Sequence, residues 1–222
     1  MSGRVVAIDG PSGSGKSTIG RGVATALGLR TLDTGAMYRA VTLAVLRAGR
    51  DPADGEAAAG AARTVTITVE EGVTTLDGDD VSAEIRGPAV TGAVSTVSAH
   101  PSVRAELVAR QRAWVAEHGG GVVEGRDIGS VVFPDAAVKV FLTASDDERA
   151  RRRQRDEAQA DRALSMGEVR ASMAARDEAD SGRAASPLTT ADGATIVDTT
   201  GRSVADIVAE IVGAFRVAEG AV

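Results

Sequence analysis

An eight-residue segment near the beginning of the chain has the composition of a phosphate-binding loop. Residues 10–17 read Gly-Pro-Ser-Gly-Ser-Gly-Lys-Ser and fit the pattern G-x-x-x-x-G-K-S/T in full. The glycines allow backbone torsions that point successive N–H groups into one concavity, where phosphate oxygens can bind. Lys16 supplies an ammonium for the β- and γ-phosphates, and the Ser17 hydroxyl is placed to coordinate Mg²⁺. The segment predicts nucleoside triphosphate binding, but it does not identify what accepts the phosphate.

The elements beside this segment are those that a phosphate loop requires. An apolar run at 5–8 indicates a buried parallel strand before it, and a helix is expected after it, from about Lys16 to Leu27, ended by Gly28. The beginning of that helix adds about half a positive charge beside the phosphates. An ordinary Gly-rich turn is the alternative, but both the consensus and its context favour the loop. We therefore expect ATP to contact Gly10, Pro11, Ser12, Gly13, Ser14, Gly15, Lys16, Ser17 and Thr18.

The remaining pattern predicts a parallel α/β domain over residues 1–222 with two excursions from its core. Further core strands are expected at 29–32, 122–123, 138–142 and 195–197. Helices are expected at 36–48, 88–98 and 102–117, after capping-box serines at 145 and 165, and from 203 onward. Thr alternates with Val or Ile over 64–69, and turns at 71–72 and 77–78 flank a further strand at 73–76, so we expect a small antiparallel meander at 64–81. We place the two excursions at about 36–105 and 146–164.

Composition excludes several classes of protein and of site. The 222 residues are 43% hydrophobic and 25% charged, so the chain can bury a substantial core, and the net charge of −6 argues against general nucleic-acid binding. The absence of cysteine excludes disulfides and thiolate chemistry, and two histidines make a multi-histidine metal site improbable. No apolar stretch approaches the roughly 20 residues that span a bilayer, and the N-terminus does not read as a signal peptide. We therefore expect a cytoplasmic monomer that binds neither membranes nor nucleic acids.

The rest of the sequence narrows the kind of nucleotide-binding protein. Asparagine is missing altogether, so the Asn-Lys-x-Asp guanine reader of GTPases is absent, and no L-S-G-G-Q-like signature of transport ATPases is present. The strand at 122–123 runs into Glu-Gly-Arg-Asp rather than the Asp or Asp-Glu ending of motor ATPases. Arginines are numerous outside the loop, and five of them lie between Asp147 and Arg155 against two acids. An isolated run of this kind is usually a solvated helix face, but beside a phosphate loop it favours a lid that covers a transferring phosphoryl group and excludes water.

Five motifs in order resemble those of the bacterial cytidylate kinases, over nearly the whole chain. They are DGPSGSGK at 9–16, DTGAMYR at 33–39, GRDIG at 125–129, VVFPDA at 131–136 and RDE at 176–178. The resemblance implies a nucleoside monophosphate kinase fold: a parallel five-stranded sheet flanked by helices, a β-containing insert that binds the monophosphate, and an Arg-rich lid. It also implies phosphoryl transfer from ATP, with Mg²⁺, to CMP, and to dCMP as a second acceptor.

The resemblance also carries the family's site onto matching positions of this chain. The phosphate of CMP would be held by Arg39, Arg126 and Arg183, and the cytosine would be read by Ser95, Arg104 and Asp127. Arg176 and Asp180 would lie near the ribose, Thr34 beside the monophosphate, and Asp33 near Mg²⁺ together with Ser17. The catalytic cations would be Lys16, Arg126, Arg183 and Arg153, and the lid would contribute Arg149 and Arg153 to ATP, with Arg152 as a further candidate.

The chemistry of the residues agrees with these assignments. A guanidinium stays charged and grips phosphate oxygens bidentately. Cytosine offers an amine that Asp127 can accept, and acceptors that Arg104 can satisfy, whereas uracil would present a carbonyl to the carboxylate. Two rival hypotheses remain. One is a kinase of the same fold for UMP or a hydroxyl-bearing metabolite, and the other is a regulatory module that binds ATP without transferring phosphate.

Overall fold

The computed structural model describes residues 4–70, 72–159, 164–183 and 186–220. The chain divides into two compact units, which are described separately below. The first unit comprises Met1–Arg30 and Gly119–Val222, and the second comprises Thr31–His118. No helix in the described part of the chain is long and apolar enough to cross a membrane.

The first unit is built on parallel strands. Its elements are β1 (Val5–Asp9), α1 (Lys16–Leu27), β6 (Gly121–Gly125), η2 (Ile128–Val132), β7 (Val138–Thr143), α6 (Asp146–Gln159), α7 (Met166–Ser181), β8 (Thr195–Asp198) and α8 (Val204–Gly220). Strand β1 pairs in parallel with β6 and β7, and β7 pairs in parallel with β8. The complete strand order is β2-β6-β1-β7-β8, with β2 at Thr31–Asp33, so the predicted five-stranded sheet is confirmed.

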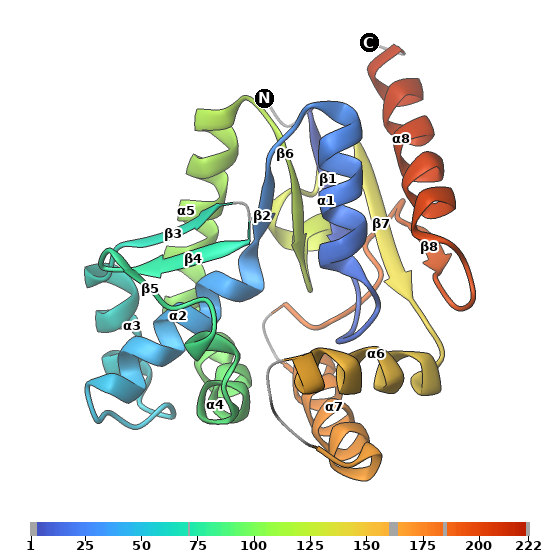
Figure 1. Ribbon diagram of the computed structural model, residues 1–222. Coiled ribbons are helices and arrows are strands. Elements are labelled where there is room, and N and C mark those ends of the chain that lie inside the picture. The colour runs from blue at the N-terminus through green and yellow to red at the C-terminus, as the bar shows by residue number, and fades with distance from the viewer. Residues whose placement is uncertain (1–3, 71, 160–163, 184–185, 221–222) are drawn as a thin grey trace. The chain divides into compact units, whose positions relative to one another are not determined.

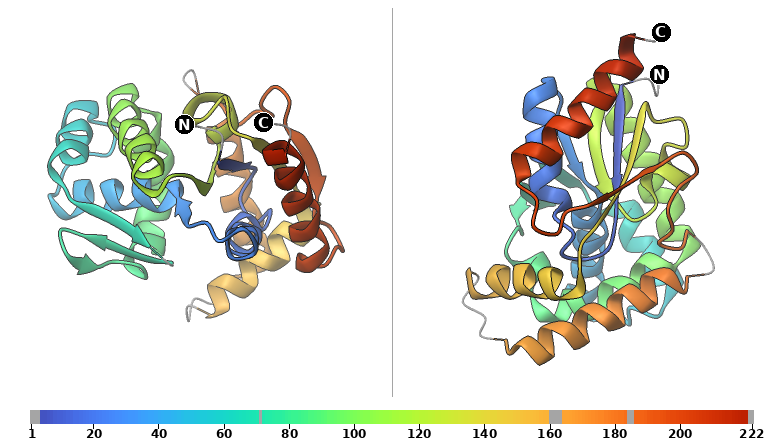
Figure 2. Two further views of the ribbon diagram at one scale, coloured as in Figure 1. Left: turned by 90° about the horizontal axis from the view of Figure 1, so that it is seen from above. Right: turned by 90° about the vertical axis from the view of Figure 1, so that its right-hand side faces the viewer.

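Burial explains why β1 occupies the centre of this sheet. All five residues of β1 are buried, as expected of a parallel strand that is covered on both faces. A strand in this position needs apolar side chains on both faces, which accounts for the continuous apolar run at 5–8. On one face α1 and α8 pack side by side (Figures 1 and 2). The core that they share with the strands includes Ile8, Ile19, Val23, Leu142, Ile207, Ile211 and Phe215.

The parallel arrangement also explains where chemistry can occur. The carboxyl ends of neighbouring parallel strands meet at one edge of a sheet, which is where ligands bind in this class of fold. The phosphate loop follows β1, Arg126 and Asp127 follow β6, α6 begins after β7, and Thr199 follows β8. Residues far apart in the sequence are therefore brought to one edge of the first unit.

Helices α6 and α7 lie side by side (Figure 2, right). The Ser165 capping box is complete: the Ser165 hydroxyl accepts from the Glu168 N–H, and the Glu168 carboxylate accepts from the Ser165 N–H. At the beginning of α6, Ser145 Oγ accepts from the Glu148 N–H at 3.3 Å. Residues 160–163 of the excursion predicted at 146–164 lie outside the described residues.

The second unit begins with β2 and continues with α2 (Thr34–Arg47), α3 (Gly55–Thr64), β3 (Ile67–Glu70), β4 (Val73–Leu76), β5 (Asp79–Asp80), η1 (Glu84–Arg86), α4 (Pro88–Ala99) and α5 (Pro101–His118). Strands β3, β4 and β5 form an antiparallel sheet of their own, which confirms the predicted meander. Helix α2 has ten buried residues, in keeping with its continuous run of small and apolar side chains.

Three local features differ from the sequence-based expectations. Helix α3 was not predicted, because its sequence is rich in Ala and Gly and has no large apolar side chain. Its clearest signal is Asp54, whose carboxylate accepts from the N–H groups of Glu56 and Ala57. Trp114 is partly exposed and stacks on the His118 ring at 4.3 Å between centroids, although large aromatic side chains usually pack in the core. The π-helical turn η2 after the GRDIG motif was also unforeseen.

Candidate functional site

The phosphate loop owes its shape to glycines at two positions of close approach. A Cβ on Gly10, where φ is +149°, would stand 2.2 Å from the Leu142 carbonyl oxygen. A Cβ on Gly13, where φ is +75°, would stand 2.9 Å from the Arg149 carbonyl oxygen. Larger residues would therefore clash with β7 or with α6 as well as strain the backbone. The loop is fixed between these two elements, and α1 begins directly after it at Lys16.

Lys16 and Ser17, the two loop residues whose side chains are expected to act on the phosphates and on Mg²⁺, are both anchored within the first unit. Lys16 Nζ donates to the carbonyl oxygens of Gly10 and Pro11, at 2.7 and 2.8 Å. The Ser17 hydroxyl donates to Glu124 Oε2 at 2.9 Å, and Glu124 is the next-to-last residue of β6, which is buried throughout. Glu124 was not among the predicted site residues, because the sequence does not show that the end of β6 faces the beginning of α1.

The oxygen atoms of Ser17 and Glu124 form a pair of the kind that Mg²⁺ prefers. Within the described residues no group of three or more His, Cys, Asp or Glu side chains could hold a metal by itself. A pair of oxygens fits a cation that binds together with a triphosphate. Such a cation takes one or two ligands from the protein and the others from phosphate and water oxygens. The Ser17 part of the predicted Mg²⁺ site is thus chemically suitable.

Three arginines converge on one buried carboxylate. The Asp180 side chain is 1% exposed; Oδ2 accepts from Arg126 Nε at 2.9 Å and lies 3.9 Å from Arg176 Nε, while Oδ1 accepts from Arg183. Burial raises the pKa of Asp180, but the charges of Arg126, Arg183 and Arg176 outweigh burial and hold that pKa below its ordinary value. Asp180 is therefore ionised at neutral pH, and the cluster retains a net positive charge.

This cluster adjoins the phosphate loop. Arg126 Nη1 donates to the Gly10 carbonyl oxygen at 3.0 Å, so the guanidinium that Asp180 holds also contacts the first residue of the loop. The structure thus brings together Arg126, Arg176, Asp180 and Arg183, which the sequence predicted as one group. Asp127, the next residue after Arg126, is buried and precedes η2.

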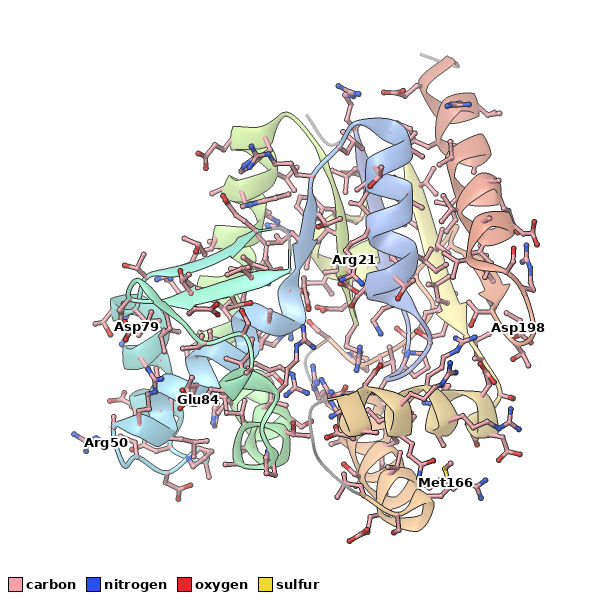
Figure 3. The ribbon with its side chains drawn as sticks, in the orientation of Figure 1. Arg21, Arg50, Asp79, Glu84, Met166 and Asp198 are labelled. Atoms are coloured by element: carbon pink, nitrogen blue, oxygen red, sulfur yellow. The ribbon has the colours of Figure 1, made fainter. Side chains whose placement is uncertain are left out.

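The arginines of α6 differ in what they contact. Arg149 donates to the Ser12 carbonyl oxygen at 3.1 Å and to Asp177, whose other oxygen accepts from the Ser12 N–H at 3.3 Å. Arg152 Nη1 lies 3.4 Å from the Ser14 carbonyl oxygen. Arg153 instead pairs with Glu157 at 2.5 Å. The three belong to a helix seen in Figure 3 beside α7, whose first residue, Met166, is labelled.

Asp9 fastens the end of β1 to the segment that follows Arg126 and Asp127. Its two carboxylate oxygens each accept a backbone N–H at 2.8 Å, from Ile128 and from Gly129. Burial raises the pKa of Asp9 from 3.8 to about 6, against these two hydrogen bonds, which lower it. The ionisation of Asp9 therefore affects the two hydrogen bonds that hold the beginning of η2.

This coupling predicts a pH dependence of stability. Because the folded-state pKa of Asp9 exceeds the unfolded value of 3.8, the folded state binds its proton more tightly, and the free energy of unfolding falls between pH 4 and pH 6. The fall is about 3 kcal/mol from this residue and is complete above about pH 6. The measurement is urea denaturation of wild type and of Asp9→Asn at several pH values. The difference between their free energies of unfolding should change with pH by this amount. A difference that stays constant from pH 4 to 7 contradicts the assignment.

The second unit holds a separate pair of buried arginines. Arg39 Nη1, on α2, donates to the Ile85 carbonyl oxygen at 2.8 Å and to Thr91 Oγ1 at 2.9 Å, which ties it to η1 and α4. Arg104, on α5, lies with its guanidinium carbon 5.5 Å from the centre of the Tyr38 ring. Both arginines are only 5% exposed, so their charges are held in place by the surrounding helices.

The other predicted residues of this unit lie on the same helices. Asp33 is the N-cap of α2: Oδ1 accepts from the Ala36 N–H at 3.0 Å, and Oδ2 lies 3.4 Å from Arg86 Nη2. Thr34 is the first, buried residue of α2, and Ser95 is a half-buried residue of α4. The proximity of Asp33 to Mg²⁺ stays a prediction, as do the ligand contacts of Thr34 and Ser95.

A hollow of about 330 Å³ opens beside the phosphate loop in the first unit. It is lined by residues of the loop and of α1, by the α6 residues Arg152, Arg155 and Asp156, and by residues of α8 and of the segment before it. The sequence offered no signal for it, because its walls come from three separate stretches of the chain.

Comparison with known proteins places the chain in a family. A family model described as cytidylate kinase matches residues 6–217. A cytidylate kinase of Mycobacterium leprae is 50% identical over 222 residues, covering 100% of both chains, and one of Mycolicibacterium paratuberculosis is 53% identical over 208 residues, covering 92% of this chain and 91% of its own. Among solved structures, a gluconokinase from Sinorhizobium meliloti matches with a TM-score of 0.51 and 16% identity, over 99% of this chain and 95% of its own. At that identity the likeness concerns the fold alone.

Proposed function

Because the chain belongs to the cytidylate kinase family, we propose that it transfers the γ-phosphoryl group of ATP to CMP, giving ADP and CDP, with dCMP as a second acceptor. The observation that carries this proposal is the Arg126–Asp180–Arg183 cluster in contact with the first residue of the phosphate loop. A protein that only binds ATP has no need of a second cationic group at that point. The enzyme would act on free nucleotides, as a monomer in the cytoplasm.

The acceptor phosphate needs no general base. Its second pKa is about 6, so it is mostly dianionic at neutral pH and can attack directly. Catalysis then consists of positioning and of charge neutralisation by Lys16, Arg126 and Arg183, with Arg149 and Arg153 from α6 over the donor phosphates. When bound with ATP beside Ser17 and Glu124, Mg²⁺ supplies further neutralisation of the β- and γ-phosphates.

The residues of the acceptor site would recognise CMP by its phosphate and by its base. Arg39 would join Arg126 and Arg183 on the phosphate, and Arg176 and Asp180 would lie near the ribose. Arg104, already oriented against the Tyr38 ring, would donate to the cytosine acceptors together with Ser95, and Asp127 would accept from the exocyclic amine. Transfer requires the acceptor phosphate to meet the γ-phosphate of ATP in line.

An acceptor-specificity assay tests the proposal. At saturating ATP, ADP formation is measured with CMP, dCMP, UMP and AMP in turn. CMP and dCMP are expected to support it, and UMP to be at least about tenfold poorer, since a carbonyl facing the Asp127 carboxylate leaves a buried acceptor unpaired. A preference for UMP would overturn the roles of Asp127 and Arg104. Absence of CMP-dependent ADP formation would support the regulatory module instead.

A further inference from the structure

Thr199 is a buried residue at the end of β8 that connects three parts of the first unit. It is 2% exposed, and its N–H donates to the Thr143 carbonyl oxygen at 2.8 Å, which extends the pairing of β8 with β7 by one residue. Asp198, labelled in Figure 3, marks the end of the strand directly before it. The Thr199 backbone is therefore fixed, and its side chain has little freedom.

The Thr199 hydroxyl lies between the phosphate loop and α6. The Ser14 carbonyl oxygen is 3.2 Å from Oγ1 and the Thr143 carbonyl oxygen is 3.0 Å from it, so its one proton can be given to either. Oγ1 also accepts from Arg152 Nη1 at 2.8 Å. A single buried hydroxyl thus contacts a carbonyl of the loop and a guanidinium of α6.

Arg152 is oriented mainly by this residue. Its Nη2 donates to the Thr199 carbonyl oxygen at 3.0 Å, so Thr199 holds the guanidinium at two points, while Glu148 holds Nε at 2.9 Å. The same Nη1 would stand 3.4 Å from a Cβ on Gly15. The guanidinium plane is therefore set against residues 14 and 15 of the loop, at the wall of the 330 Å³ hollow.

We propose that Thr199 is a positioning residue for ATP: its hydroxyl sets the Arg152 guanidinium against the phosphate loop, so that the donor nucleotide meets both. The inference rests on the proposed function, because it assigns ATP to this loop. The inference concerns the ATP site alone, so it predicts a change in the binding of ATP and no change in the KM for CMP. Thr199 itself touches no substrate in this scheme; it acts through Arg152.

Equilibrium titration with ATP, together with steady-state kinetics, tests this role. Thr199→Val keeps the shape and removes the hydroxyl, and it is expected to weaken ATP binding and raise KM for ATP about tenfold, with KM for CMP unchanged. Thr199→Ser restores the hydroxyl and should return ATP affinity to within about twofold of wild type. Thr195→Val, an exposed threonine of the same strand, is the matched control and should not alter ATP affinity.

A double-mutant cycle separates positioning from simple stabilisation. If Thr199 acts through Arg152, the loss of ATP affinity caused by Thr199→Val should shrink to less than about twofold in an Arg152→Ala background. Equal losses in both backgrounds, or unaltered ATP affinity in Thr199→Val, would overturn the proposal. Should the valine variant fold poorly in a thermal melt, Thr199→Ala carries the same test with a smaller side chain. Because binding is read directly, a wild type that binds ATP without phosphorylating CMP would refute the proposed function and leave this inference testable.

Discussion

Replacing Lys16 with alanine is expected to lower turnover of ATP and CMP about a thousandfold while the fold is retained. In the proposed reaction the charge of Lys16 would act on phosphates whose negative charge is redistributed during transfer, and loss of one such cation would remove about 4 kcal/mol of transition-state stabilisation. The partners of Lys16 in the structure are two partly buried carbonyl oxygens of its own loop, and in the truncated variant water can replace the ammonium as their partner. Steady-state kinetics and a thermal melt together measure the two effects.

The chain offers a matched control for this substitution, since Lys139 is its one other lysine. Lys139 Nζ donates to the Asp192 carbonyl oxygen at 2.8 Å, on the exposed side of β7. Lys139→Ala should change turnover less than about twofold. A Lys16→Ala enzyme with a rate near that of wild type would remove Lys16 from the mechanism, whatever the melt shows.

The parts of the fold that were predictable are those whose signals are local in sequence. Helix α1 begins at Lys16 and ends at Leu27 as expected, because a glycine-rich loop and the left-handed Gly28 mark its two ends. The Ser165 capping box and the meander between 64 and 81 likewise carry their own turn and cap residues. Helix α3, seven of whose ten residues are alanine or glycine, has no large apolar side chain on its buried face, and its position in the second unit depends on tertiary packing.

The residues of the candidate site also divide into those that have a signal in the sequence and those that have none. A resemblance could name Arg126, which stands in the GRDIG motif, and Asp180 and Arg183, which follow the RDE motif within five residues, and the structure brings the three together. It could not name Glu124 or Thr199, whose partners Ser17 and Arg152 are 107 and 47 residues away in sequence. Such contacts depend on which strand ends face the loop, and no spacing in the sequence encodes that.

The arginine run on α6 shows why spacing alone is insufficient. Consecutive residues of a helix are rotated by about 100° about its axis. Arg152 and Arg153 therefore point in different directions, although both are arginines. The structure sets Arg149 and Arg152 against the loop and pairs Arg153 with Glu157. The roles of Arg149 and Arg153 in ATP binding stay predictions. A role of Arg152 in ATP binding is likewise a prediction, and its contacts with Ser14 and Thr199 support it.

Replacing Asp180 with asparagine is expected to lower the free energy of unfolding by about 3–5 kcal/mol and to impair use of CMP. The carboxylate is buried among three arginines, and removal of one partner from a buried ionic group leaves uncompensated charge. Chemical denaturation and CMP kinetics measure both losses. Glu178→Gln, two residues away and exposed, is the matched control and should alter unfolding by no more than about 0.5 kcal/mol.

Added inorganic phosphate distinguishes a ligand site from a purely structural cluster. If Arg126 and Arg183 hold the acceptor phosphate, then in Asp180→Asn an anion can take the place of the lost carboxylate. Binding to the folded state alone stabilises it in proportion to the logarithm of ligand concentration, so phosphate should raise the denaturation midpoint of the variant more than that of wild type. If phosphate stabilises neither protein, the arginines are held only for the fold, and the assignment of the acceptor phosphate to Arg126 and Arg183 is wrong.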